Sequence, residues 1–196
     1  MKQKLPYMFS NFYNRVDDWL LMSSPWPTAA LCILYYYIIR VAGPRFMKDR
    51  EPLNIQNLVV VYNLFQTLFS VWIFQKACRF WFTGKYNWLC QPVDYSYTQD
   101  GFDAADMTWW YFFSKFIDFI DSFFFLFRKK FSHLSTLHVV HHGIMPLTAW
   151  SGVKWVGGGH TTFVGFLNMG VHVLMYFYYF MSSMGPSVQK YLWWKR

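Results

Sequence analysis

The sequence predicts an all-α fold, a polytopic bundle of transmembrane helices. Of its 196 residues, 55% are hydrophobic and 24% aromatic, while only 14% are charged. An average soluble domain carries about 25% charged residues. The apolar residues also lie in long blocks, and a helix crosses a bilayer with roughly 20 predominantly apolar residues. Most of these blocks lack the polar face at helical period that a soluble helical core would need.

Five blocks are long enough, or nearly so, to form spans. They run over residues 26–41, 53–74, 108–127, 134–156 and 161–181. The first is short, and we expect Trp26 and the tyrosines of this block to anchor it at the membrane interface. The Gly43-Pro44 pair and the glycines at 157–159 should break helices. Residues 76–107 form the one long connector.

The charge distribution predicts a topology. Lys and Arg outnumber Asp and Glu by 18 to 10, which suggests nucleic acid as a partner until the positions are considered. Basic clusters follow the first, third and fifth blocks: Arg40, Arg45, Lys48 and Arg50; Arg128, Lys129 and Lys130; Lys190, Lys195 and Arg196. The positive-inside rule makes their side cytosolic and puts the N-terminus outside the cytosol. No signal peptide is visible, so the first span should act as its own insertion signal.

We expect one domain over residues 1–196, because neither an internal repeat nor a low-complexity tract interrupts the chain. Three cysteines are too few for a disulfide framework. Cys90 lies in the non-cytosolic connector, where an oxidising lumen would let it pair; a free thiol is equally compatible. The ending, with Trp193 and Trp194 before Lys195 and Arg196, has the aromatic-then-basic pattern that precedes a further span.

Polar side chains inside the blocks carry the functional signal. Ionisable groups in lipid are costly and usually mark function or a paired interior contact, and helical residues three and four apart are neighbours. Three clusters have that spacing: His138, His141 and His142 on the fourth block; Lys115, Asp118, Asp121 and Ser122 on the third; Asn168, His172, Met175, Tyr176 and Tyr179 on the fifth. A weaker polar face on the second block holds Tyr62, Asn63 and Gln66.

Each cluster has a structural and a functional interpretation. The three imidazoles can line one side of their helix, and three in five residues inside a span favour function over packing. The lysine and the aspartates can neutralise one another, or the carboxylates can orient and polarise the imidazoles. The tyrosine stripe alone indicates packing, whereas His172 with Asn168 is a stronger signal. Imidazole is both nucleophile and base near neutral pH and can carry an acyl group, so such a set can attack a thioester and hold an enolate.

At these residues the sequence resembles the very-long-chain fatty acid elongases, the ELO family of endoplasmic-reticulum condensing enzymes. The similarity runs over residues 26–196, and the motifs occur in order. They are Gly43-Pro44 with Met47, Arg50 and Pro52; Tyr62-Asn63 with Gln66; Cys90 to Ser96; the HxxHH box at His138, His141 and His142; and HxxMYxYY at His172, Met175, Tyr176, Tyr178 and Tyr179. The family's KxxExxDT reads as Lys115, Asp118, Asp121 and Ser122, so Asp118 reaches one methylene less far than glutamate.

The resemblance implies a seven-helix fold with six helices in a barrel-like arrangement. About five of these spans are present here, because the family's glutamine-bearing sixth span follows the Trp-Trp-Lys element at which this chain ends. We therefore expect a single elongase domain that is incomplete at its C-terminus, with a substrate tunnel that lacks one side.

The resemblance also implies a reaction, in which a long acyl-CoA condenses with malonyl-CoA to give 3-ketoacyl-CoA, CO2 and CoA without a metal or other cofactor. His141 is the expected acyl acceptor, and His172 would face it and position the thioester carbonyl or the enolate. His138 and His142 would be base or orienting partners, with Lys115, Asp118 and Asp121 behind them. The substrate-binding residues would be Asn63, Gln66, Asn168, Tyr176, Tyr179, Lys195 and Arg196, with CoA phosphates meeting the basic clusters.

Localisation and partners follow from the same resemblance. We expect the chain in the endoplasmic reticulum membrane, with a lumenal N-terminus. Its expected partners are the bilayer and other proteins, in homo- or hetero-oligomers with other elongases and with the reductase and dehydratase of the cycle. Nucleic acid is not expected as a partner.

Two alternatives to the elongase interpretation remain open. Membrane di-iron desaturases and hydroxylases also carry HxxHH, although they use several histidine boxes and this chain has six histidines in all. The chain could also be a non-enzymatic membrane protein, either a transporter or a truncated, non-catalytic elongase-like protein that associates with active copies.

Overall fold

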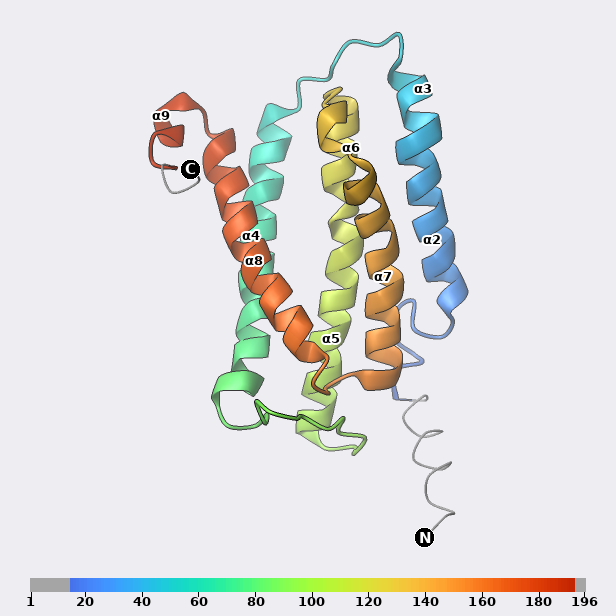
Figure 1. The fold of residues 1–196 in the computed structure, drawn as a ribbon, viewed down its shortest axis with the longest axis vertical. Coiled ribbons are helices and arrows are strands. Elements are labelled where there is room, and N and C mark those ends of the chain that lie inside the picture. The colour runs from blue at the N-terminus through green and yellow to red at the C-terminus, as the bar shows by residue number, and fades with distance from the viewer. Residues whose placement is uncertain (1–14, 193–196) are drawn as a thin grey trace. The chain divides into compact units, whose positions relative to one another are not determined.

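The computed structural model describes residues 15–192, and every regular element in that range is helical (Figure 1). The elements are α2 (Pro25–Tyr37), the π-helical turn η1 (Ile38–Ala42), α3 (Gly43–Met47), α4 (Gln56–Phe82), α5 (Gln99–Ile117), α6 (Phe119–Phe127), the 3-10 turn η2 (Phe131–His133), α7 (Thr136–Val156), α8 (Thr162–Ser183) and α9 (Pro186–Gln189). A helix lies over each of the five predicted blocks. The all-α prediction is therefore confirmed.

The described residues form two compact units. The first unit comprises residues 15–52 and 89–162, and the second comprises residues 53–88 and 163–192. Within the described part of the chain, α4 and α8 are long and apolar enough to cross a membrane by length and composition. Both belong to the second unit. The spans expected at α2, α5–α6 and α7, and the single domain expected over residues 1–196, stay predictions.

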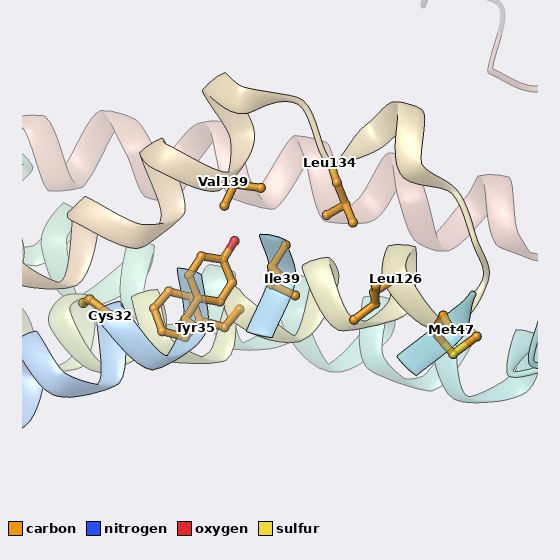
Figure 2. Packing of buried hydrophobic residues seen from close by; sticks show 8 residues of the cluster. Cys32, Tyr35, Ile39, Met47, Leu126, Leu134 and Val139 are labelled. Carbon is orange, nitrogen blue, oxygen red and sulfur yellow. The ribbon is translucent and has the colours of Figure 1, made fainter. Parts of the chain in front are cut away.

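Apolar packing holds the first unit together. Within it, α7 packs against α2 and α5, and α3 packs against α6. One buried cluster joins α2, η1, α3 and α6 to the start of α7: Cys32, Tyr35, Ile39, Met47, Phe119, Leu126, Leu134 and Val139 (Figure 2). Burial of such side chains contributes about 1.5–3 kcal/mol for each large one. This cluster fixes the first turns of α7, where the histidine box begins.

The segment before α2 anchors the other end of α7. Val16 and Met22 are fully buried in a second cluster with side chains of α5 and α7. The indole N–H of Trp150 donates to the Leu21 carbonyl at 2.9 Å. The buried ammonium of Lys154 donates to the Asp17 carboxylate and, at 3.3 Å, to the Met22 carbonyl. A buried lysine is costly unless it is paired, so these contacts explain how α7 accommodates Lys154.

Side-chain caps set several helix starts. The N-cap of α2 is Ser24, whose hydroxyl accepts a hydrogen bond from the Trp26 N–H. The Thr98 hydroxyl caps α5 by accepting from the Gly101 N–H, and the Ser135 hydroxyl caps α7 by accepting from the His138 N–H. These are the positions that N-cap residues favour. The Thr98 cap starts α5 well before residue 108, and α4 runs on to Phe82 because Phe80 and Trp81 are buried. The predicted connector over residues 76–107 is therefore too long.

The helix that begins at Pro25 does not break at Gly43-Pro44, so that prediction was wrong. Proline has no N–H to donate and its ring clashes with the carbonyl four residues before it. The chain avoids a break by widening to a π turn over Ile38–Ala42, in which the Gly43 N–H donates to the Ile38 carbonyl. The glycines at residues 157–159 do end α7 as expected: Gly157 caps it, and Gly158 has φ +87°.

The tyrosines of α2 have different environments. Tyr36 and Tyr37 are exposed, as is Trp26, whereas Tyr35 is 2% exposed and stacks on Phe119 with ring centroids 4.0 Å apart. For Tyr35 the predicted role of interface anchor was therefore wrong. The third block also differs from expectation, since a turn at Asp118 separates α5 from α6.

Aromatic contacts join α4 and α8 in the second unit. Phe74 stacks on Phe166 with centroids 5.1 Å apart, and Trp81 meets Phe163 at 5.1 Å. The Gln56 amide donates to the Ser183 carbonyl at 2.7 Å. Gly170 lets the Phe74 ring approach, since a Cβ on Gly170 would lie 3.2 Å from that ring.

Candidate functional site

The histidine box occupies the first turns of α7 in the first unit. The Ser135 hydroxyl accepts from the His138 N–H at 3.1 Å and so fixes where the helix begins. His138 and His142 are half-buried, with ring centroids 4.4 Å apart, whereas His141 is exposed. The His141 and His142 rings are 5.5 Å apart and nearly perpendicular. The box therefore presents two enclosed imidazoles and one accessible imidazole.

This division follows from helical geometry. One residue step rotates the helix by about 100°, so His142 lies about 40° from His138 while His141 lies about 60° to its other side. The packing of α7 against α2 buries the side that carries Val139. The expectation that all three imidazoles line one side holds for His138 and His142, and His141 stands at the edge of that side.

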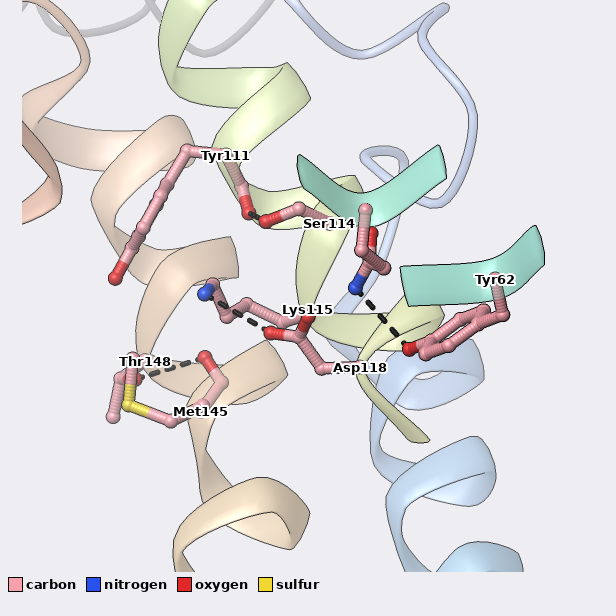
Figure 3. A network of polar contacts seen from close by, with 8 residues as sticks. Tyr62, Tyr111, Ser114, Lys115, Asp118, Met145 and Thr148 are labelled. Atoms are coloured by element: carbon pink, nitrogen blue, oxygen red, sulfur yellow. Dashed lines mark hydrogen bonds and ion pairs between the residues drawn. The ribbon is translucent and has the colours of Figure 1, made fainter. Parts of the chain in front are cut away.

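Lys115 of α5 and Asp118, at the turn between α5 and α6, form a buried ion pair. The Lys115 ammonium donates to Asp118 Oδ2 at 3.1 Å, and their side chains are 3% and 2% exposed (Figure 3). Lys115 also lies 4.7 Å from the centre of the Tyr111 ring, a cation–π arrangement. The predicted neutralisation of lysine by aspartate is thus present for Asp118. Asp121 is half-buried on the next turn.

Ser122 links this face to the histidine box. Its hydroxyl lies 2.9 Å from His138 Nε2 and 2.8 Å from the Tyr35 hydroxyl. Helical spacing groups Ser122 with Lys115, Asp118 and Asp121, but it does not predict the hydrogen bond between Ser122 and Tyr35. The Ser122 hydroxyl thus makes a hydrogen bond to a box imidazole, that of His138.

A second polar set lies in the second unit, on α4 and α8. Tyr62, Asn63 and Gln66 are buried, and the Gln66 amide donates to the Tyr62 hydroxyl at 3.2 Å (Figure 3). The Tyr62 and Tyr176 rings meet edge to face at 6.2 Å, and Tyr176 lies 5.5 Å from His172. The weaker polar face of the second block thus lies beside the polar stripe of the fifth.

The remaining predicted site residues differ in exposure. His172 and Tyr176 are buried, Asn168 is half-buried and Tyr179 is 38% exposed. Lys195 and Arg196 lie outside the described residues. Within residues 15–192, no three histidine, cysteine, aspartate or glutamate side chains are arranged to hold a metal ion.

Basic side chains lie at the same end of the first unit as the histidine box. The Arg40 guanidinium donates to the Thr136 hydroxyl at 3.0 Å, two residues before His138. The Lys129 ammonium donates to the Lys48 carbonyl at 3.1 Å, which joins the basic cluster after the first block to the cluster after the third. This end of the unit therefore combines the half-buried cations of Arg40 and Lys129 with imidazole groups.

Comparison with known proteins supplies the family. The ELO family (GNS1/SUR4) matches residues 20–196. The chain is 52% identical over 183 residues to a very long chain fatty acid elongase of Aedes aegypti, covering 93% of this chain and 51% of that protein. It is 50% identical to very long chain fatty acid elongase 7 of Drosophila melanogaster, covering 93% of this chain and 55% of that one.

A human relative gives the same result. Very long chain fatty acid elongase 4 of Homo sapiens is 43% identical, covering 93% of this chain and 58% of its own length. The chain thus spans little more than half the length of these curated relatives. With its helical fold, its histidine box and a family match that runs from residue 20 to residue 196, the chain belongs to the ELO (GNS1/SUR4) family.

Proposed function

We propose that this chain acts in fatty acid elongation as a condensing enzyme, extending a long acyl-CoA by two carbons taken from malonyl-CoA. The observation that carries the proposal is the histidine box at the start of α7, where two half-buried imidazoles stand beside the exposed imidazole of His141. The relatives named as very long chain fatty acid elongases support it. The alternative of a non-catalytic elongase-like protein is an outcome of the test below.

In the proposed first step, an imidazole nitrogen of His141 attacks the thioester carbonyl of the acyl-CoA. The carbon–sulfur bond breaks, the thiolate of CoA leaves with the imidazole proton, and an acyl-imidazole remains. His141 suits this role because it is the accessible member of the box. His138 and His142 act as base or orienting groups beside it, with Lys115, Asp118 and Asp121 behind them.

In the proposed second step, malonyl-CoA loses CO2 and its remaining carbanion attacks the acyl carbonyl. The new carbon–carbon bond forms as the bond to the imidazole nitrogen breaks, which gives 3-ketoacyl-CoA. The released imidazole nitrogen takes up a proton from water, and this restores neutral His141. His172 positions the thioester carbonyl or the enolate. The reaction needs no electron acceptor and no metal, so we assign no cofactor.

Substrate recognition is proposed in two parts. The CoA phosphates bind the basic clusters, because Arg and Lys suit anionic groups; Arg40 and Lys129 lie at the end of the first unit that carries the box. Lys195 and Arg196 add to this charge. The polar side chains of α4 and α8 contact the acyl substrate: Asn63, Gln66, Asn168, Tyr176 and Tyr179.

We further propose that the chain resides in the endoplasmic reticulum membrane, with the N-terminus lumenal and the basic clusters cytosolic. The bilayer supplies the long acyl substrate. Other elongases, and the reductase and dehydratase that process 3-ketoacyl products, are the proposed protein partners.

The test measures incorporation of radiolabelled malonyl-CoA into long-chain acyl products by microsomes that express the chain. We expect His141→Ala to lower incorporation by at least about 100-fold, the size of effect that positioned acid–base and nucleophilic groups provide. His160→Ala is the matched control, because His160 is also exposed and lies beyond the box. Equal incorporation by the chain and by His141→Ala would refute the proposal. Stoichiometric iron in the purified protein would instead favour the di-iron oxidases.

A further inference from the structure

A buried chain of two hydroxyl groups reaches the histidine box from α2 and α6. The Tyr35 hydroxyl lies 2.8 Å from Ser122 Oγ, which lies 2.9 Å from His138 Nε2. Tyr35 is 2% exposed and Ser122 is 0% exposed. Figure 2 shows the Tyr35 hydroxyl pointing from α2 toward the segment of α7 that carries Val139. Three helices thus contribute one group each to a continuous hydrogen-bonded chain.

The surroundings of Tyr35 separate the role of its hydroxyl from that of its ring. The ring stacks on Phe119 at 4.0 Å and lies in the apolar cluster with Cys32 and Ile39. A phenylalanine would satisfy this packing equally well. The hydroxyl is therefore a separate feature, and its hydrogen bond is made to Ser122 rather than to solvent.

The direction of the hydrogen bonds follows from counting protons. Within residues 15–192 the Tyr35 hydroxyl has Ser122 as its hydrogen-bonding partner. If Ser122 donated to Tyr35, the phenol O–H would be left in the core without an acceptor, which buried polar groups rarely tolerate. Tyr35 therefore donates to Ser122. A serine oxygen can accept two hydrogen bonds but has a single proton. If His138 Nε2–H donated to Ser122 as well, the buried Ser122 proton would be left without an acceptor in the Tyr35–Ser122–His138 chain. Ser122 therefore donates its proton to His138 Nε2.

We propose that Tyr35 and Ser122 are positioning residues that hold neutral His138 as the tautomer protonated at Nδ1. An Nε2 that accepts a hydrogen bond carries no proton, so the ring proton lies on Nδ1. The same bond fixes the ring against His142, 4.4 Å away. Since the Nε2 lone pair accepts the hydrogen bond from Ser122, His138 is an orienting group and not the acyl acceptor. This role in the reaction rests on the proposed function, whereas the assignment of the tautomer is independent of it.

The tautomer is tested by nitrogen-15 NMR of histidine-labelled protein in nanodiscs, at a pH where the ring is neutral. His138→Gln identifies the His138 signals among those of the six histidines. We expect a pyridine-type resonance for Nε2 and a pyrrole-type resonance for Nδ1. Ser122→Ala and Tyr35→Phe should each produce a mixture of tautomers, while Ser122→Thr, which keeps the hydroxyl, should match the unmodified chain.

Tyr36→Phe is the matched control, because it removes a hydroxyl from an exposed neighbour on α2. It should leave the His138 resonances unchanged. A pyrrole-type Nε2 in the unmodified chain would overturn the proposal, and this result needs no variant to fold. Resonances that are the same with and without Ser122→Ala would overturn it as well.

The malonyl-CoA assay tests the consequence for the reaction. Ser122→Ala should lower incorporation about tenfold, as expected when one orienting hydrogen bond is lost, and Ser122→Thr should restore it. An active chain in which Ser122→Ala has no effect would refute the positioning role. A chain that incorporates no label would refute the proposed function, while the tautomer result would still stand or fall by the NMR measurement.

Discussion

At the scale of single residues, Asp94 shows how one carboxylate organises the loop between α4 and α5. Its Oδ1 accepts from the Ser96 N–H at 2.8 Å, and its Oδ2 accepts from the Thr98 hydroxyl at 3.4 Å. The Arg15 guanidinium donates to the Ser96 carbonyl at 3.1 Å. Partial burial raises the pKa of Asp94, but the hydrogen bonds from Ser96 and Thr98 and the charge of Arg15 lower it more.

The lowered pKa of Asp94 predicts a pH-dependent loop. Because the folded pKa lies below the ordinary value of 3.8, the stabilisation is fully present above pH 3.8 and is lost as pH falls through the lowered pKa. We expect the hydrogen-exchange protection of the Ser96 amide to fall over that range, as measured on protein in detergent. Asp94→Asn should start with less protection and show no such transition. A transition that persists in Asp94→Asn would assign the effect to another group.

The residues of the candidate site differ in how far the sequence could predict them. Lys115 and Asp118 are three positions apart on one chain segment, so helical spacing alone predicts that they can pair, and they do. Tyr35 and Ser122 are 87 positions apart. Their contact depends on how α2 packs against α6, and no local pattern encodes that packing. The same reason explains why spacing could not predict that His141 is exposed while His142 is half-buried.

At the scale of elements, the junction from α2 to α3 depends on both residues of the Gly43-Pro44 pair. Pro44 favours the π turn before it, because its missing N–H disrupts a regular α-helical ladder. Gly43 serves packing: a Cβ there would lie 2.7 Å from the Ile38 carbonyl oxygen and would collide with the Leu126 side chain of α6. The sequence suggested a break because glycine and proline usually interrupt helices. Here the helix continues through both residues, because the π turn accommodates Pro44 and close packing requires Gly43.

Gly43→Ala should therefore destabilise the first unit. We expect a loss of about 1–3 kcal/mol, the usual cost of forcing an extra methyl group into a packed core, measured as a lower unfolding midpoint in detergent. Gly152→Ala is the matched control in α7, since nothing lies within 4 Å of a Cβ at that position. It should be neutral or stabilising by up to about 1 kcal/mol. Equal effects of the two substitutions would contradict the packing role of Gly43.

At the scale of the whole molecule, the chain is a helical membrane protein whose helices follow its long apolar blocks. Composition predicted where helices lie, because the blocks are much longer than turns allow. It did not predict where they end: α4 and α5 extend into the expected connector because Phe80, Trp81 and the Thr98 cap continue the helices past the apolar stretch. The loop that remains, residues 83–98, carries Cys90.

Cys90 provides a direct test of the proposed topology. Of the three cysteines, Cys32 is buried, Cys78 is half-buried on α4, and Cys90 is exposed. If the loop over residues 83–98 is lumenal, a membrane-impermeant maleimide should label Cys90 in permeabilised microsomes and not in intact, sealed ones. A membrane-permeant reductant added beforehand keeps the thiol reactive in an oxidising lumen.

Cys90→Ser is the control for this experiment, and it should remove most of the labelling because exposure favours reaction of a thiol. Labelling of Cys90 in sealed microsomes would place the loop on the cytosolic side. The basic residues after α3 and α6 would then lie in the lumen, against the positive-inside rule. CoA phosphates supplied from the cytosol would no longer reach them, and the proposed substrate recognition would have to be abandoned together with the topology.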